Sequence, residues 1–171
     1  MRQRKLGPVK AGIIWVAAIA GILVAGCASD PLTLQAVGPW TSNKTRRADV
    51  GSLQVFTAPT ERNDAGIQYL YPQNYFIYQT NTLVKSVVNS ATMSEQPSVV
   101  DLPPGEYLVR APADGFGWVH VPVVIKAGSL TEVHLDRRWR PGDWRSATNL
   151  ATMPDGSPMG AKPREPERPK K

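Results

Sequence analysis

Cysteine is almost absent from this sequence, whose 171 residues include a single one, Cys27. An intrachain disulfide is therefore excluded, and so is a metal site built from several cysteines. The sequence also lacks the nucleophile elbow, the H-E-x-x-H zinc pattern, the phosphate-binding loop and the dinucleotide-binding fingerprint. These absences predict a protein that is not an enzyme and that takes no cofactor.

The middle of the chain also lacks an excess of positive charge. The formal net charge is +6, with 20 basic and 14 acidic residues, but the excess lies at the two ends. Residues 1–26 carry four positive charges and no acid, and residues 137–171 carry nine basic and four acidic residues. The middle of the chain is mildly acidic, so nucleic acid is not an expected partner.

Long apolar runs are missing too, apart from one near the N-terminus. Residues 1–10 hold the four positive charges, and residues 11–25 (AGIIWVAAIAGILVA) are all apolar or small. A membrane-spanning helix needs about 20 apolar residues, so this run is too short to span. The pattern predicts a secretory signal, and a retained anchor is the alternative.

Residues 24–27 (VAGC) lie directly behind this leader and resemble the bacterial lipobox. The resemblance implies that residues 1–26 are a lipoprotein signal peptide, cut before Cys27, and that this cysteine carries fatty acyl chains. Each buried methylene contributes about 0.8 kcal/mol, so several chains hold a protein on a membrane. Ala28 is not the aspartate that retains many lipoproteins on the inner membrane, which favours the outer membrane, facing the periplasm or the surface. An ordinary buried cysteine is the alternative.

Residues 27–50 are polar and show no helical period. They predict a tether between the membrane and a folded domain. A basic cluster at 44–47 (KTRR) within it serves either solubility or contact with anionic head groups or cell wall.

From residue 51 onward, β-branched and aromatic residues alternate with polar ones, and turn residues interrupt them about every ten positions. This pattern predicts an all-β fold, a single antiparallel β-sandwich of about seven strands over residues 51–136. The expected strands are 52–57, 75–79, 83–88, 98–102, 106–111, 117–126 and 130–136, with a polar turn at 59–66.

Two strand pairings follow from short turns. Pro103-Pro104-Gly105 suggests that 98–102 pairs with 106–111, and residues 127–129 suggest a hairpin of 117–126 with 130–136. In residues 117–126 the alternation places three valines and Ile125 on the core face, and Pro122 predicts an edge strand or a bulge.

Residues 102–111 (LPPGEYLVRA), 115–128 (GFGWVHVPVVIKAG) and 131–135 (TEVHL) resemble the C-terminal half of carboxypeptidase regulatory-like, or prealbumin-like, domains. The resemblance covers roughly residues 51–136. It implies a transthyretin-like or immunoglobulin-like sandwich without a catalytic centre of its own, of the kind used for adhesion, stabilisation or surface display. Kinship of fold does not transfer function.

The two histidines, His120 and His134, suggest a possible metal site. In the expected hairpin they are diagonal neighbours on one face, with Asp136 opposite His120. Diagonal neighbours lie about 7 to 8 Å apart. Zinc sites in proteins use three or four converging ligands, so we expect no metal here, and these three residues are the candidates if one is bound.

Aromatic residues crowd into positions 69–78. Tyr69 and Tyr71, together with Trp118, suggest a platform for a sugar or a peptide. The alternative is that these rings pack in the core and at the rim of the sandwich.

Residues 137–171 read as a basic, proline-rich tail, and the last ten residues cannot bury a core. Two tryptophans in it, Trp139 and Trp144, either fold back on the sandwich or dock on a partner. Taken together, the sequence predicts a membrane-tethered envelope lipoprotein whose sandwich is a non-catalytic binding or structural module for an envelope protein or a cell-wall polymer. The alternative is a carbohydrate-binding module that uses its exposed aromatic residues.

Overall fold

The structure is a computed structural model that describes residues 31–40, 49–89, 96–142 and 149–164. The predicted signal peptide, the predicted lipidation site at Cys27, the basic cluster at 44–47 and Trp144 lie outside these residues. In the ranges that are described, no helix is long and apolar enough to cross a membrane.

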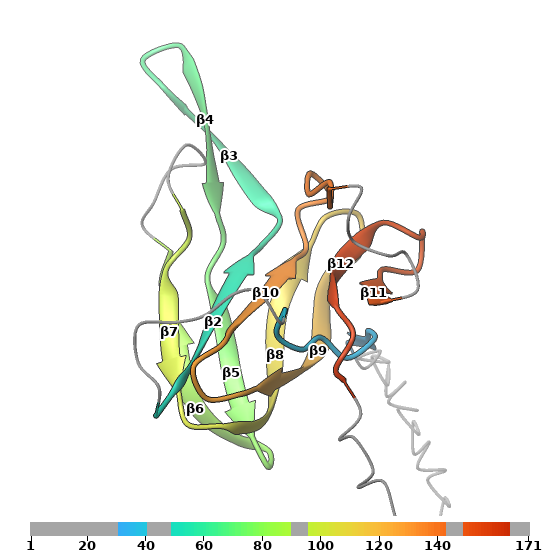
Figure 1. Ribbon diagram of the computed structural model, residues 1–171. Coiled ribbons are helices and arrows are strands. Elements are labelled where there is room, and N and C mark those ends of the chain that lie inside the picture. The colour runs from blue at the N-terminus through green and yellow to red at the C-terminus, as the bar shows by residue number, and fades with distance from the viewer. Residues whose placement is uncertain (1–30, 41–48, 90–95, 143–148, 165–171) are drawn as a thin grey trace, which may run out of the picture.

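Most of the described chain forms β-strands (Figure 1). The strands are β1 (Leu32–Thr33), β2 (Gly51–Phe56), β3 (Pro59–Asp64), β4 (Ile67–Pro72), β5 (Tyr75–Gln79), β6 (Thr82–Val87), β7 (Val99–Leu102), β8 (Gly105–Ala113), β9 (Gly117–Ile125), β10 (Leu130–His134), β11 (Leu150–Thr152) and β12 (Pro158–Ala161).

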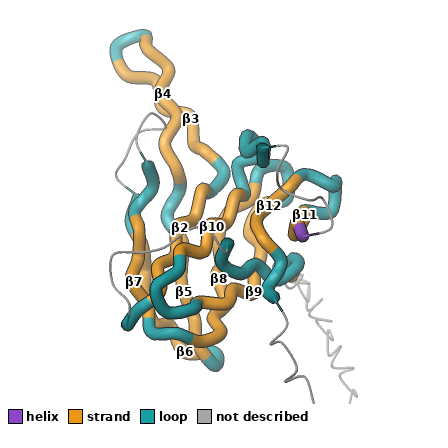
Figure 2. The backbone as a smooth tube through the Cα atoms, viewed as in Figure 1, coloured by secondary structure: helices purple, strands orange, loops and turns teal. Residues whose placement is uncertain are grey.

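The strands form two larger sheets and two smaller strand pairs (Figure 2). The larger sheet has the order β1-β9-β8-β5-β6, and the second has the order β10-β2-β7. β3 pairs with β4, and β11 pairs with β12. This arrangement confirms the predicted all-β sandwich. Two of its pairings, β1 with β9 and β10 with β2, are parallel.

One hydrophobic core joins the two larger sheets. The predicted alternation along residues 117–126 is confirmed, because Val119, Val121, Val123 and Ile125 are at most 2% exposed. Val133 of β10, in the second sheet, belongs to the same core. Removing these branched side chains from water is the main favourable contribution to folding.

The predicted hairpin of 117–126 with 130–136 is wrong. β10 pairs in parallel with β2, so that Leu130 lies opposite Ser52 and His134 opposite Phe56. The chain therefore crosses from one sheet to the other after Ile125. The physical reason is that an alternating pattern shows which face of a strand is buried but does not show which strand is its neighbour.

The second predicted pairing, of 98–102 with 106–111, is wrong for the same reason. β7 pairs with β2 in one sheet, whereas β8 pairs with β5 and β9 in the other. The Pro103-Pro104-Gly105 segment thus connects the sheets instead of closing a hairpin.

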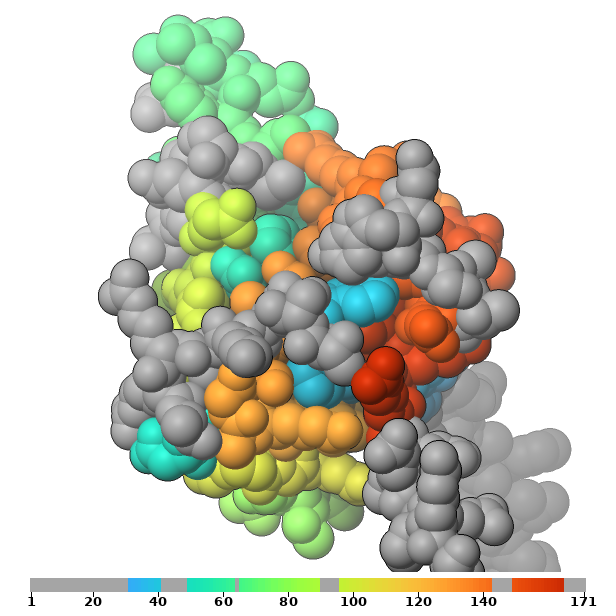
Figure 3. Space-filling model, in the orientation of Figure 1, coloured from blue at the N-terminus to red at the C-terminus, as the bar shows by residue number. Residues whose placement is uncertain are grey.

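Residues 59–66, predicted as a polar turn, are instead the first part of a β-hairpin. β3 and β4 pair from Pro59↔Pro72 to Asp64↔Ile67, and this hairpin projects from the body (Figure 3). Its tip has φ of 51° at Ala65 and 83° at Gly66, as a tight two-residue turn requires. No alternating signal marks β3 because Thr60, Glu61 and their neighbours are exposed.

The predicted tether does not extend through residues 31–40. β1 pairs with β9, and Val37 is fully buried. The Val37 N–H donates to the carbonyl oxygen of Pro122 at 2.9 Å, so this segment covers the outer edge of β9. The edge strand or bulge predicted from Pro122 is wrong, because β9 lies between β1 and β8 and pairs with β8 without a register shift. The missing N–H of Pro122 lies on the same side of the strand as its carbonyl oxygen and therefore faces residues 31–40, where it interrupts no bond to β8.

The predicted tail is also folded at residues 149–164. β11 and β12 form a hairpin in which Met153 and Met159 belong to the core. At Gly160 an added Cβ atom would lie 2.6 Å from Cγ1 of Val37, so the two terminal segments pack closely together. The folded domain thus extends beyond 51–136 at both ends. Short strands made of small residues carry little strand signal, which is why sequence patterns miss them.

Candidate functional site

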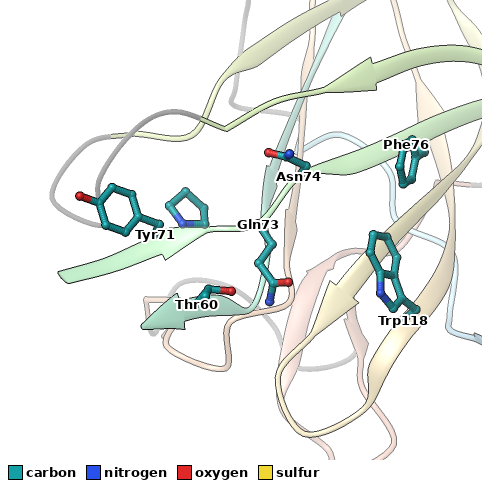
Figure 4. Close-up of a pocket in the computed structure, with 7 residues that line it drawn as sticks. Thr60, Tyr71, Gln73, Asn74, Phe76 and Trp118 are labelled. Carbon is teal, nitrogen blue, oxygen red and sulfur yellow. The ribbon is translucent and has the colours of Figure 1, made fainter. Parts of the chain in front are cut away.

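A shallow groove of about 420 Å³ lies where the β3–β4 hairpin joins the body (Figure 4). It is bounded by the hairpin on one side and by β5 and β9 on the other. The side chains that line it are Thr60, Tyr71, Pro72, Gln73, Asn74, Phe76 and Trp118.

Two aromatic rings form one wall of the groove. Phe76 lies between the fully buried residues Tyr75 and Ile77, so strand alternation turns it to the outer face of the sheet. Its ring centroid lies 5.9 Å from that of Trp118, with 25° between the ring planes. Trp118 is 42% exposed. An aromatic pair of this kind on the open face of a sheet adds nothing to the core and is available to a ligand.

Arg110 of β8 supports this wall. Its backbone pairs with Phe76 on β5 and with His120 on β9. Its guanidinium carbon lies 5.3 Å from the centroid of the Trp118 ring, within the range of a cation–π interaction. The Trp118 ring is therefore held by two neighbours while much of its surface stays exposed.

The polar wall consists of two amide side chains, each fixed at one end. Gln73 Nε2 donates to the carbonyl oxygen of Ala58 at 3.1 Å, and Asn74 Oδ1 accepts from the Asn89 N–H at 3.0 Å. Within the described ranges, Gln73 Oε1 and Asn74 Nδ2 have no hydrogen-bond partner. The groove therefore offers one positioned acceptor and one positioned donor.

Buried polar groups hold the backbone beneath these amides. The carbonyl oxygen of Gln73 accepts from the Thr57 hydroxyl and from Asn89 Nδ2, both at 2.9 Å. Thr57 is 1% exposed and Asn89 is 8% exposed. Such bonds are protected from water and fix the position of the connection between β4 and β5.

The three residues of the predicted platform do not all meet at one place. Tyr71 and Trp118 both line the groove. Tyr69 lies further along the hairpin, with its ring centroid 6.3 Å from that of Tyr71, and does not line it. Sequence reasoning missed Gln73, Asn74 and Phe76. The alternation of residues 75–79 places Phe76 on the face opposite Tyr75 and Ile77 but does not show which face lies outward.

The structure does not bring the three candidate metal ligands together, because the hairpin on which their placement depended does not form. His120 lies on the outer face of the larger sheet, beside Arg110 and Thr33. His134 is buried in the second sheet, between the rings of Phe56 at 4.2 Å and Trp139 at 4.4 Å. Among the described residues, no group of three or more His, Cys, Asp or Glu side chains could hold a metal ion.

Trp139 was expected either to fold back on the sandwich or to dock on a partner, and in the structure it folds back on the sandwich. Besides His134, this ring contacts Trp40, with centroids 6.2 Å apart. Trp144 and Cys27 lie outside the described residues.

Comparison with protein-family models, with curated proteins and with solved structures found no significant match. The resemblance of residues 102–135 to carboxypeptidase regulatory-like domains thus stays a prediction. What the groove can do has to be argued from its own chemistry.

Proposed function

We propose that this chain is a lipid-anchored envelope protein whose β-sandwich is a non-catalytic binding module, with the groove beside Trp118 as its binding site. The observation that carries the proposal is the pair Phe76 and Trp118, two large rings placed on the outer face of the sheet and held there by their neighbours. Exposed aromatic residues rimmed by polar groups are typical of binding surfaces.

The lining of the groove favours binding over catalysis. Its described residues supply amides, a threonine hydroxyl, a phenol and apolar rings, and none of them supplies a carboxylate, imidazole, amine or thiol. General acid–base catalysis near neutral pH depends mostly on the latter groups. These groups can therefore hydrogen-bond to a ligand and stack on it, but they are poorly suited to catalyse a reaction of it.

The proposed lipid anchor is supported by the sequence of the leader and by Cys27. The position at which the folded domain begins limits how far the domain can lie from the membrane. Three residues separate Cys27 from Pro31, where the described domain begins, so four Cα–Cα steps join the two. Even fully extended, these four steps span at most about 14 Å. An acylated Cys27 would consequently hold the domain next to the membrane surface, so its partners are envelope components that lie near that membrane.

A photo-crosslinking residue in place of Trp118, in the full chain expressed in its own membrane, tests this proposal. We expect adducts with envelope material from position 118, and we expect the protein in the membrane fraction unless Cys27→Ala is introduced. The same photoreactive residue at Val99, which is 55% exposed on the second sheet, is the control. Equal labelling from positions 118 and 99, or membrane association that ignores Cys27→Ala, would contradict the proposal.

A further inference from the structure

The two walls of the groove differ in chemistry. One is the aromatic surface of Phe76 and Trp118, and the other carries the positioned amides of Gln73 and Asn74. In Figure 4 the Gln73 side chain extends from the β4–β5 connection toward the side where Thr60 and Trp118 lie. A ligand that fits has to present an apolar face to the rings and a rim of hydrogen-bonding groups to the amides.

Charge narrows the class of ligand further. Among the described residues, none that lines the groove carries a formal charge, and the cation described above, Arg110, is directed to the Trp118 ring. Anionic ligands such as phosphates are generally bound by Arg, Lys or backbone N–H groups. An uncharged ligand therefore suits the groove better than an anion.

The position of the groove also disfavours an added peptide strand. Peptides that extend a sheet need a free strand edge with unpaired backbone groups. Phe76 pairs with Ser86 on one side and with Arg110 on the other, so the backbone beneath the groove is already inside the sheet. The surface on offer consists of side chains on the face of the sheet.

Resting on the proposed binding function, we propose that the groove binds a neutral glycan chain. A sugar ring presents an apolar face of C–H groups and a rim of hydroxyl or acetamido groups. Its face would stack on Trp118, and its rim would donate to Gln73 Oε1 and accept from Asn74 Nδ2. We infer this class of ligand because three groups line the same groove: the exposed indole ring of Trp118, the acceptor Gln73 Oε1 and the donor Asn74 Nδ2.

Titration calorimetry with the full chain in detergent micelles tests this inference. The probes are the hexamer of β-1,4-linked N-acetylglucosamine and the matching glucose hexamer, which differ only in the acetamido groups, and purified peptidoglycan sacculi serve as an insoluble probe in a pull-down. We expect at least one of the three to bind. Trp118→Ala should weaken that binding about tenfold or more, and Trp118→Phe should retain part of it, because a ring remains to stack.

A second variant separates the amide contact from the fold. Asn74→Asp keeps the Oδ1 atom that accepts from the Asn89 N–H but removes the Nδ2 donor. We expect an unchanged melting temperature and binding weakened about fivefold. Leu83→Ala, at a half-exposed position on β6 outside the groove lining, is the matched control and should bind as the parent does.

Failure of all three probes would overturn the glycan inference, and so would binding that survives both Trp118→Ala and Asn74→Asp. This failure differs from failure of the proposed function. If position 118 crosslinks to an envelope protein while no glycan binds, the binding module stands and its ligand is a protein.

Discussion

His134 and Trp139 stack face to face, with ring centroids 4.4 Å apart and only 3° between their planes. Phe56 stacks on His134 as well, at 4.2 Å and 12°. The three rings connect β2, the end of β10 and the chain that follows β10. They explain why residues predicted to leave the domain at Arg137 continue along its surface.

Trp139→Ala should therefore destabilise the domain. Loss of this stack removes a half-buried ring and exposes His134, for which we expect a loss of about 2 kcal/mol in the free energy of unfolding. Urea denaturation measures it. Trp139→Phe should recover part of the loss, and the exposed Lys126→Ala should cost almost nothing. A Trp139→Ala protein as stable as the Lys126→Ala protein would show that the stack does not hold the segment.

How far the sequence predicts this fold depends on whether the signal is local. The strand at 75–79 and the core face of 117–126 are both observed, because burial on one face leaves an alternating pattern within a few residues. Strand pairing is a relationship between distant segments, and the parallel pairing of β10 with β2 leaves no trace in either strand alone. A turn such as Pro103-Pro104-Gly105 looks the same whether it closes a hairpin or changes sheets.

The site follows the same rule. Tyr71 and Trp118 could be selected because aromatic residues are conspicuous in a polar or alternating context. Gln73 and Asn74 could not, since two amides between strands are ordinary turn residues. Their positions depend on distant residues: the Ala58 carbonyl oxygen holds the Gln73 amide, and the N–H of Asn89, 15 residues after Asn74, holds the Asn74 amide.

Gly160→Ala tests the close packing of the two terminal segments. A Cβ atom at this position would lie 2.6 Å from Cγ1 of Val37 and 2.7 Å from the carbonyl oxygen of Glu132. Overpacking of this kind costs about 1–3 kcal/mol. In the double variant with Val37→Ala, the new methyl group uses space that the valine vacates, so the two changes should cost less together than the sum of the single costs. Strict additivity in urea denaturation would contradict this contact.

Asp155 should make the domain less stable in strong acid. The Ser157 hydroxyl donates to Asp155 Oδ1 at 2.6 Å, and Arg137 Nε donates to Oδ2 at 2.8 Å. These bonds, with that from the Ser157 N–H, lower the pKa of Asp155 from 3.8 to about 2. An ionised Asp155 therefore stabilises the folded state at any pH above the ordinary pKa of the group. This stabilisation is lost as the pH falls through the lowered pKa of the folded state.

Asp155→Asn tests this contribution through melting temperatures measured as a function of pH. We expect the variant to melt below the parent at neutral pH, and the gap to shrink as the pH falls from about 4 to about 2. Arg164→Ala, an exposed change outside the pair, should leave the whole curve unchanged. A gap that stays constant across that interval would show that ionisation of Asp155 does not contribute.

Asp136 should have the opposite pH dependence. This carboxyl group is 7% exposed at the end of the β10 segment, and its burial raises its pKa above 3.8, although the Arg138 N–H donates to Oδ1. A carboxyl group whose pKa is raised on folding makes the folded state less stable once the group is ionised. The free energy of unfolding therefore falls as the pH rises through the pKa that Asp136 has in the folded state.

Asp136→Asn keeps an oxygen for the Arg138 N–H and removes the buried charge. The variant should therefore melt above the parent at neutral pH, and the two should converge as the pH falls below 3.8. A variant that melts below the parent at neutral pH would mean that the ionised carboxylate is stabilised by its surroundings, and Asp136 would then act like Asp155.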